Sequence, residues 1–291
     1  MKHLIISVLF TVLFAHVANA QITMGSLSLP SASAENAVVI DDVQFVAQYE
    51  MSFIQDTLNA ENVSEETMML KMGKKTSMFY SYTHFVADSL LRVQMRNSEG
   101  RVMQRREPGS KSGGQITYKI FKNYPDGKVT TLERIGLSRF LCEEENERPQ
   151  WQLLPDTATI LSYLCRKATC NFKGREYAAW YAPEIPRSEG PWKLHGLPGL
   201  ILKAEDSRGH YAFECTGLFN GQPDEKIEFG ADNYEPVSRR TLNRTYERYV
   251  ADPVGFITSS SPNVRIIIKS EDGQDAKNPK NIPYNPIELA E

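Results

Sequence analysis

Residues 192–200, WKLHGLPGL, are the stretch that decides the fold, and they lie inside the longer informative segment 162–219. Gly196 and Gly199 flank Leu197-Pro198, so the backbone can enter positive φ on either side of a proline whose φ is held at about −65°. The segment LILKAED follows at 200–206, and HYAFECTGLF at 210–219 alternates apolar and polar residues with period two. This pattern predicts a bend that redirects the chain, then a strand, a tight turn and a second strand.

Upstream of the bend, 157–172 is expected to run extended, to turn at 171–174 and to return along 175–182, REYAAWYA. In the return strand Tyr177 and Tyr181 share one face and Trp180 lies on the other. Large aromatic residues on both faces predict a sheet that is covered on each side.

The rest of the chain favours further strands and two helices. Apolar residues recur at helical spacing in 83–97 and again in 236–251, where Pro236 suits the first position of a helix. We therefore predict a mainly β (α+β) protein with a strongly curved antiparallel sheet, or a half-open barrel, against which two helices pack. The expected strands outside 157–219 are 43–54, 67–73, 76–82, 115–121, 128–135 and 138–144, and the sequence also allows strands at 226–230 and 264–270.

The N-terminus has the pattern of a secretory signal. Lys2 precedes a short apolar run that ends in Ala18-Asn19-Ala20, which matches an A-x-A cleavage site. We expect 1–20 to be a signal peptide, 21–37 a flexible lead-in and 38–291 a single domain. The mature protein would then be exported, to the periplasm or beyond, with no transmembrane segment after cleavage.

Composition indicates a globular protein and argues against nucleic acid as a partner. The chain is 41% hydrophobic and 24% charged, with a formal net charge of −3. Removing Lys2 with the signal leaves 32 basic residues against 36 acidic ones, a net charge of −4. Binding to nucleic acid phosphates requires a basic face, which this composition does not favour.

Export also places the cysteines in an oxidising compartment, where two disulfides are expected. An extended 160–172 would separate Cys165 from Cys170 by roughly 17 Å, beyond the Cα limit of ~7 Å for a disulfide. Of the three possible pairings we favour Cys170–Cys215, because each shares a face with aromatic residues, and this leaves Cys142–Cys165. A metal site is disfavoured, since the cysteine spacings do not match those of zinc fingers.

No catalytic pattern is present in the sequence. His84, His195 and His210 are the histidines after the signal, and none belongs to an H-E-x-x-H motif or lies near a G-x-S-x-G elbow. His195, beside the bend, is the best single candidate for a functional imidazole. We therefore predict no catalytic residue, no metal and no cofactor.

The string GLPGLI at 196–201, preceded by GPWKLH, resembles the GLPGLI family of exported Gram-negative bacterial proteins. The block LCRKATCNFKGREYAAWYAPEIP at 164–186 and the ending YNPIEL at 284–289 strengthen the resemblance, which spans roughly 135–289. It implies an exported β-rich domain. No activity is established for the family, so the resemblance implies no catalytic residues.

Together these features predict a non-catalytic periplasmic binding or carrier protein for an apolar or peptide ligand. Its alternatives are an accessory subunit that docks to an outer-membrane transport or assembly complex, and a hydrolase with an unrecognised site around His195. Each aromatic residue taken singly is also compatible with a core position. The candidate ligand-binding residues are Trp180, Trp192, His195, Gly196, Leu197, Pro198 and Gly199.

Overall fold

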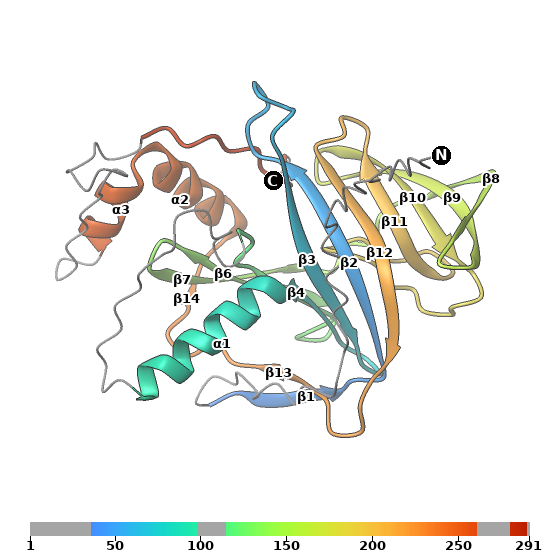
Figure 1. Ribbon diagram of the computed structural model, residues 1–291, viewed down its shortest axis with the longest axis horizontal. Coiled ribbons are helices and arrows are strands. Elements are labelled where there is room, and N and C mark those ends of the chain that lie inside the picture. The colour runs from blue at the N-terminus through green and yellow to red at the C-terminus, as the bar shows by residue number, and fades with distance from the viewer. Residues whose placement is uncertain (1–35, 98–114, 261–279, 290–291) are drawn as a thin grey trace, which may run out of the picture. The chain divides into compact units, whose positions relative to one another are not determined.

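The computed structural model describes residues 36–97, 115–260 and 280–289 (Figure 1). The predicted signal peptide at 1–20, residues 21–35 of the predicted lead-in and the possible strand at 264–270 lie outside this part of the chain. In the described residues no helix is long and apolar enough to span a membrane.

One large sheet of twelve strands dominates the described residues. Its order is β14-β7-β6-β5-β4-β3-β2-β12-β11-β10-β9-β8, and all neighbours are antiparallel except β14 and β7. A separate antiparallel pair joins β1 (Val38–Asp42) to β13 (Lys226–Phe229). The strands of the large sheet are β2 (Phe45–Ile54), β3 (Val63–Met72), β4 (Ser77–Ser81), β5 (Lys119–Lys122), β6 (Lys128–Ile135), β7 (Ser138–Glu145), β8 (Gln152–Ile160), β9 (Tyr163–Phe172), β10 (Arg175–Ala182), β11 (Leu200–Asp206), β12 (Tyr211–Asn220) and β14 (Glu235–Pro236).

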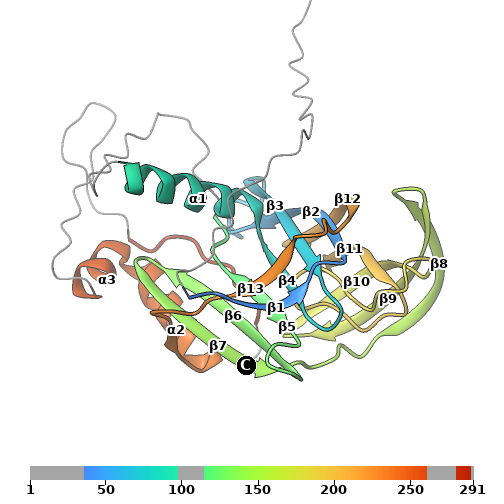
Figure 2. The same ribbon diagram turned by 90° about the horizontal axis from the view of Figure 1, so that it is seen from below.

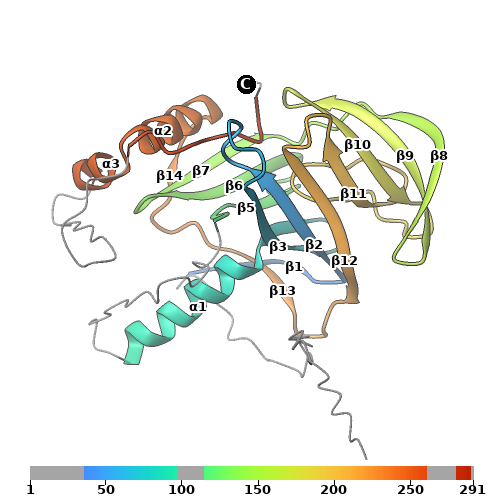
Figure 3. The ribbon, with the colours of Figure 1, turned by 45° about the horizontal axis from the view of Figure 1, so that its top comes forward.

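The sheet does not close into a barrel. Its terminal strands β14 and β8 lie at opposite ends of the sheet, as Figure 3 shows. Register shifts interrupt the pairing of β12 with β2, of β10 with β11 and of β8 with β9. Such irregularities bend strands and increase local twist. The predicted mainly β fold with an open sheet is confirmed.

The first predicted helix is confirmed as α1 (Tyr82–Asn97). The hydroxyl of Ser81 accepts a hydrogen bond from the His84 amide at 2.9 Å, so this serine caps the helix. The second helix, α2 (Arg239–Ala251), begins later than predicted, after the N-cap Ser238. Placing Pro236 in that helix was wrong, because Glu235–Pro236 forms the strand β14 alongside β7.

A third helix, α3 (Pro253–Ser260), follows α2 and was not predicted. Proline at its first position and the Asp252 side chain, which accepts from the Gly255 amide at 3.0 Å, start it locally. Figure 2 shows α2 lying along β7 and β6. There Leu242 of α2 packs with Ile135 and Phe140.

The four cysteines are buried free thiols, so the structure does not contain the two predicted disulfides. Cys142 packs under α2, in a cluster separate from the main core that holds the other three cysteines. Cys170 on β9 and Cys215 on β12 are separated by two strands, roughly 14 Å at normal strand spacing. A disulfide requires Cα atoms within about 7 Å, so strand order excludes this bond between them.

Thiol counting tests this placement. Burial raises the pKa of Cys170 and of Cys215 to about 12, so neither thiol ionises near neutral pH. We expect no reaction with an aromatic disulfide reagent in the native protein at pH 8. After unfolding without reductant, all four thiols should react. Fewer than four in the unreduced, unfolded chain would show that disulfides form.

Candidate functional site

The segment 183–199 between β10 and β11 contains the predicted bend, and we call the whole segment the bend from here on. It holds all the predicted ligand-binding residues except Trp180. It folds back onto the sheet and completes the main core. Trp192 is 1% exposed, and its ring centroid lies 5.8 Å from that of Phe172 and 6.0 Å from that of Tyr177. Leu197 is buried in the same core. Trp192 and Leu197 are therefore core residues and line no open surface.

Trp180 lies elsewhere. It alternates with the buried Ala179 and Tyr181 along β10, is half-buried, and has the Lys167 ammonium 5.6 Å from its ring centroid. The structure does not bring Trp180 and Trp192 together, so these two candidate ligand-binding residues do not share a site.

The glycines of the bend permit close packing. Gly199 has φ +153°, and a Cβ there would collide with the carbonyl oxygen of Ala182. Gly196 has φ +94°, and a Cβ there would meet the side chain of Arg148. A side chain at either position would push the segment 183–199 away from its neighbours.

A buried lysine of β5 holds the same segment from below. The Lys122 ammonium donates to the Gly190 carbonyl at 2.7 Å and pairs with Glu189 at 2.6 Å. The Tyr49 hydroxyl donates to the carbonyl of Ile201, where β11 begins, at 2.7 Å. The bend is thus attached to the sheet through its main-chain oxygens.

The bend in turn supports the entry to β8. The Trp151 indole donates to the His195 carbonyl at 2.8 Å, and the Arg148 guanidinium donates to the Gly196 carbonyl. His195 itself donates from Nδ1 to the Lys193 carbonyl at 3.0 Å, because a carbonyl can only accept. Burial, with the nearby charge of Lys122, lowers the pKa of His195, so its ring is neutral at neutral pH.

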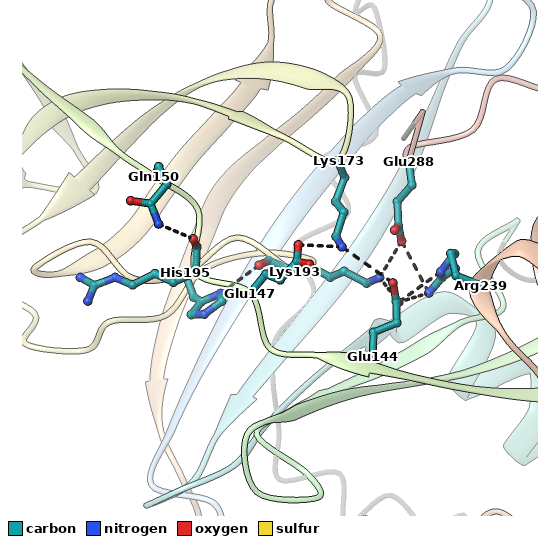
Figure 4. Close-up of polar contacts among 9 residues, drawn as sticks. Glu144, Glu147, Gln150, Lys173, Lys193, His195, Arg239 and Glu288 are labelled. Carbon is teal, nitrogen blue, oxygen red and sulfur yellow. Dashed lines mark hydrogen bonds and ion pairs between the residues drawn. The ribbon is translucent and has the colours of Figure 1, made fainter. Parts of the chain in front are cut away.

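Under the bend lies an ion cluster that the sequence analysis missed (Figure 4). Glu144 of β7 pairs with Lys193 and with Arg239, each at 2.6 Å. Glu288 pairs with Lys193 at 2.7 Å and with Arg239 at 3.6 Å. Burial would raise the pKa of Glu144, but Lys193 and Arg239 outweigh it and lower that pKa to about 2.

This cluster joins β7, the bend, the start of α2 and the C-terminal segment. Each cation is shared by two carboxylates, so the charges are compensated within the cluster. Period two on β7 places Glu144 on the face of Phe140 and Cys142, which is the signal that could have identified it. Glu144 therefore differs from Glu143 and Glu145 of the same acidic run, which are exposed.

A second buried carboxyl lies nearby on β6. Glu133 is 8% exposed, and burial raises its pKa to about 7 even though the charge of Arg239 opposes the shift. The Thr117 hydroxyl donates to it at 3.4 Å. Glu133 is therefore substantially protonated near neutral pH, unlike Glu144.

The free edge of the sheet carries the most exposed apolar surface near the bend. In the described residues β8 pairs with β9 alone. Leu153 of β8 is 57% exposed, Leu164 of β9 is 54% exposed and Leu161, at the turn between the two strands, is 39% exposed. We call these three leucines the apolar edge.

The β8–β9 turn was not predicted, because 157–172 was interpreted as one extended run. Leu161 has φ +48° and Ser162 has φ +70°. Both positions of such a turn normally carry Asn or Gly, so the sequence contained no turn signal. A leucine at positive φ is uncommon and locally strained.

The histidines do not assemble into a site. His84 lies on α1, His195 in the bend and His210 just before β12. Across the described residues no group of three or more His, Cys, Asp or Glu could hold a metal ion.

Comparison with known proteins agrees with this emphasis on the bend. A family model described as "Protein of unknown function (Porph_ging)" matches residues 171–203, from the β9–β10 turn through the bend to β11. No curated protein matches. The matched segment includes the bend, and the matched family is described as one of unknown function.

Solved structures give a remote likeness. One titled "Structure of PNGF-II in P21 space group" has a TM-score of 0.47 and 12% identity over 72% of this chain. A second crystal form of PNGF-II has a TM-score of 0.44 and 13% identity over 71% of this chain. This chain spans about a third of the length of those chains, 34% and 32%.

Replacing Gly199 tests the role of the bend. We expect Gly199→Ala to lower the free energy of unfolding by at least about 2 kcal/mol, because the new Cβ collides with backbone. Gly127→Ala is the matched control, since Gly127 also has positive φ, +75°, but nothing lies within 4 Å of its Cβ position. That control should lose only about 1 kcal/mol. Equal losses in urea unfolding would contradict the close packing.

The raised pKa of Glu133 predicts a pH dependence. Between about pH 4.5 and 7 the folded chain keeps a proton on Glu133 that the unfolded chain releases, so stability falls as pH rises through this range. We expect this group to account for about 1–3 kcal/mol of that fall.

Glu133→Gln should remove the fall, because the amide resembles the protonated acid. Glu143→Gln, at an exposed position of the adjacent strand, is the control and should leave the profile unchanged. The measurement is urea unfolding at pH 4.5, 6 and 8. A wild-type profile parallel to that of Glu133→Gln would show that Glu133 titrates normally.

Proposed function

We propose that this chain is an exported periplasmic binding protein of the GLPGLI family, without catalytic activity of its own. Its ligand is an extended apolar peptide segment that aligns along the free edge strand β8. The observation that carries the proposal is the combination of a strand edge that no described residue pairs with and three exposed leucines on one hairpin.

The backbone of β8 supplies the first part of the interaction. A strand at the end of a sheet presents unpaired N–H and C=O groups, which an added peptide strand can satisfy. Pro155 lies in β8, and the pairing with β9 shifts between Leu153 and Thr157. The longest uninterrupted pairing runs over Thr157–Ile160, with Gln152 and Leu153 paired before the shift, so the edge suits a short ligand strand.

The apolar edge supplies the second part. Side chains above and below an added strand would contact Leu153 and Leu161, whereas Leu164 on β9 lies one strand further in. Burial of one such leucine contributes about 1.5–3 kcal/mol. The strained backbone at Leu161 keeps an apolar side chain at the tip of this hairpin. A strained residue that persists in a turn supports a functional role for it.

The bend takes a supporting role in this proposal. It contacts Arg148 and Trp151, the residues that lead into β8, through its own carbonyl oxygens. It therefore fixes where the free edge begins. Its predicted ligand-binding residues act by positioning β8, and the ligand itself lies on the edge.

The structure supports an edge-bound peptide better than the other candidates. A carrier with an internal hollow needs space that Trp192 and Leu197 fill. A hydrolase centred on His195 needs a nucleophile at the second ring nitrogen, and among the described residues the ring's hydrogen bond is the one from Nδ1 to the Lys193 carbonyl. Docking to an outer-membrane complex would use the same edge, with the ligand strand supplied by the complex.

Binding of a model strand tests the proposal. The probe is a fluorescent seven-residue peptide that alternates threonine and valine, with a proline-substituted version as the negative control. We expect micromolar binding to the wild-type chain, and at least tenfold weaker binding to Leu153→Asp and Leu161→Asp, because each buries a charge against the ligand.

Leu137→Asp is the matched control for these variants. Leu137 is 53% exposed in the β6–β7 turn, remote in strand order from β8, and its substitution should not alter binding. No binding of the alternating peptide by the wild-type chain, or equal weakening in all three variants, would refute the edge as the binding site.

A further inference from the structure

The C-terminal segment 280–289 is held against the body of the protein in the manner of a bound peptide. It belongs to no strand or helix. Its attachment rests largely on buried polar side chains that come from β10, β11, β12, the bend and α2. These contacts include each residue from Tyr284 to Glu288.

Arg175 of β10 is the centre of this attachment. Its side chain is 1% exposed and pairs with the equally buried Asp206 at 2.6 Å. The second oxygen of Asp206 accepts from the backbone amides of His210 and Tyr211, at 2.7 and 2.9 Å. The guanidinium is thereby fixed in one orientation, with its remaining donors directed at the C-terminal segment.

Those donors contact three consecutive residues of the segment. Arg175 donates to the Asn285 side-chain oxygen at 2.9 Å, to the Pro286 carbonyl at 2.5 Å and to the Ile287 carbonyl at 2.9 Å. Two of the three bonds are to main-chain oxygens, which is how extended peptides are commonly gripped irrespective of sequence.

Other contacts select the side chains. The Asn285 amide donates to the Ile54 carbonyl at 2.7 Å, and the Tyr211 hydroxyl donates to the Asn285 carbonyl. The Tyr284 ring stacks on Tyr246 of α2, with centroids 4.7 Å apart. These contacts favour an aromatic residue followed by asparagine.

The end of the segment is selected by apolar packing and charge. Ile287 packs against the main core. Glu288 pairs with Lys193 and Arg239 in the ion cluster, as Figure 4 shows. The site as a whole therefore accepts the pattern aromatic, Asn, Pro, aliphatic, Glu.

We infer that Arg175, Tyr211, Lys193 and Arg239 form a sequence-selective peptide site. In the monomer, residues 284–288 of the same chain occupy this site, and residues 284–288 of a second copy can occupy it instead. Every copy carries the one sequence known to fit. Nineteen residues, 261–279, connect α3 to the segment, and a chain of that length reaches at most about 65 Å. Exchange of the segment between two copies then needs no change in the sheet.

The test begins with a full-length chain whose own segment is weakened. Asn285→Ala with Glu288→Gln removes the hydrogen bonds to Ile54 and Arg175 and the charge that Lys193 pairs with. A fluorescent peptide of residues 280–289 is then titrated into this double variant. We expect saturable binding, at least tenfold tighter than to the wild-type chain, whose site is already filled.

Two controls make the result specific. First, a peptide that carries the same two substitutions should bind the double variant at least tenfold more weakly. Second, the wild-type peptide should bind at least tenfold more weakly to a double variant that also carries Arg175→Lys, because lysine keeps the charge but lacks the planar fork. Leu153→Asp should leave this binding unchanged. Failure of this peptide site is therefore distinguishable from failure of the β8 edge as a binding site.

Complementation tests the exchange between copies. The double variant lacks a good segment and an Arg175→Lys chain lacks a good site, so an equimolar mixture should give a mixed dimer in size-exclusion chromatography with light scattering. Each variant alone should stay monomeric. A mixture that contains monomers alone would overturn exchange between copies.

A single substitution provides the test if the double variant does not fold. If the double variant shows no cooperative unfolding, Glu288→Gln alone is used, and the wild-type peptide should raise its Tm. A folded variant that neither binds the peptide nor gains in Tm would overturn the peptide site itself.

Discussion

The structure depends on the pairing of cations that have been removed from water. Lys122, Arg175 and Lys193 are buried, and an unpaired buried charge is strongly destabilising. Each is paired with a carboxylate: Lys122 with Glu189, Arg175 with Asp206, and Lys193 with Glu144 and Glu288. Lys122 and Arg175 also donate to backbone carbonyls. Because their partners are distant in sequence, these cations tie together segments that the strand pairing alone leaves separate.

This arrangement explains how one short bend influences much of the described fold. Its carbonyl oxygens bind Lys122 below and Trp151 beside it, while its Lys193 binds β7 and the C-terminal segment. The apolar residues Trp192 and Leu197 fill the core between these contacts. The bend is therefore a junction between the sheet interior, the free edge at β8 and the end of the chain. The match of a family model to 171–203 covers this junction.

Much of the fold could be predicted from the sequence. Period-two alternation identified most strands, and helical spacing identified α1 and α2, because local periodicity follows directly from which face is buried. The prediction failed where the local sequence contained no ordinary signal. The turn at Leu161–Ser162 lacks Asn and Gly, and Pro236 suited a helix start but lies in the two-residue strand β14.

The sequence by itself determined the class of fold, the position of a bend at 192–200 and the need for glycine within it, since these follow from residue spacing and backbone freedom. Only the tertiary structure decided what each candidate residue contacts. Trp192 became core, and Trp180 was left on the opposite face of β10. Cys170 and Cys215 were kept apart by strand order, and Glu144, Lys193, Arg239 and Glu288 were brought together. The physical reason is that burial and charge pairing depend on which distant strands become neighbours, and no local pattern in the chain encodes that order.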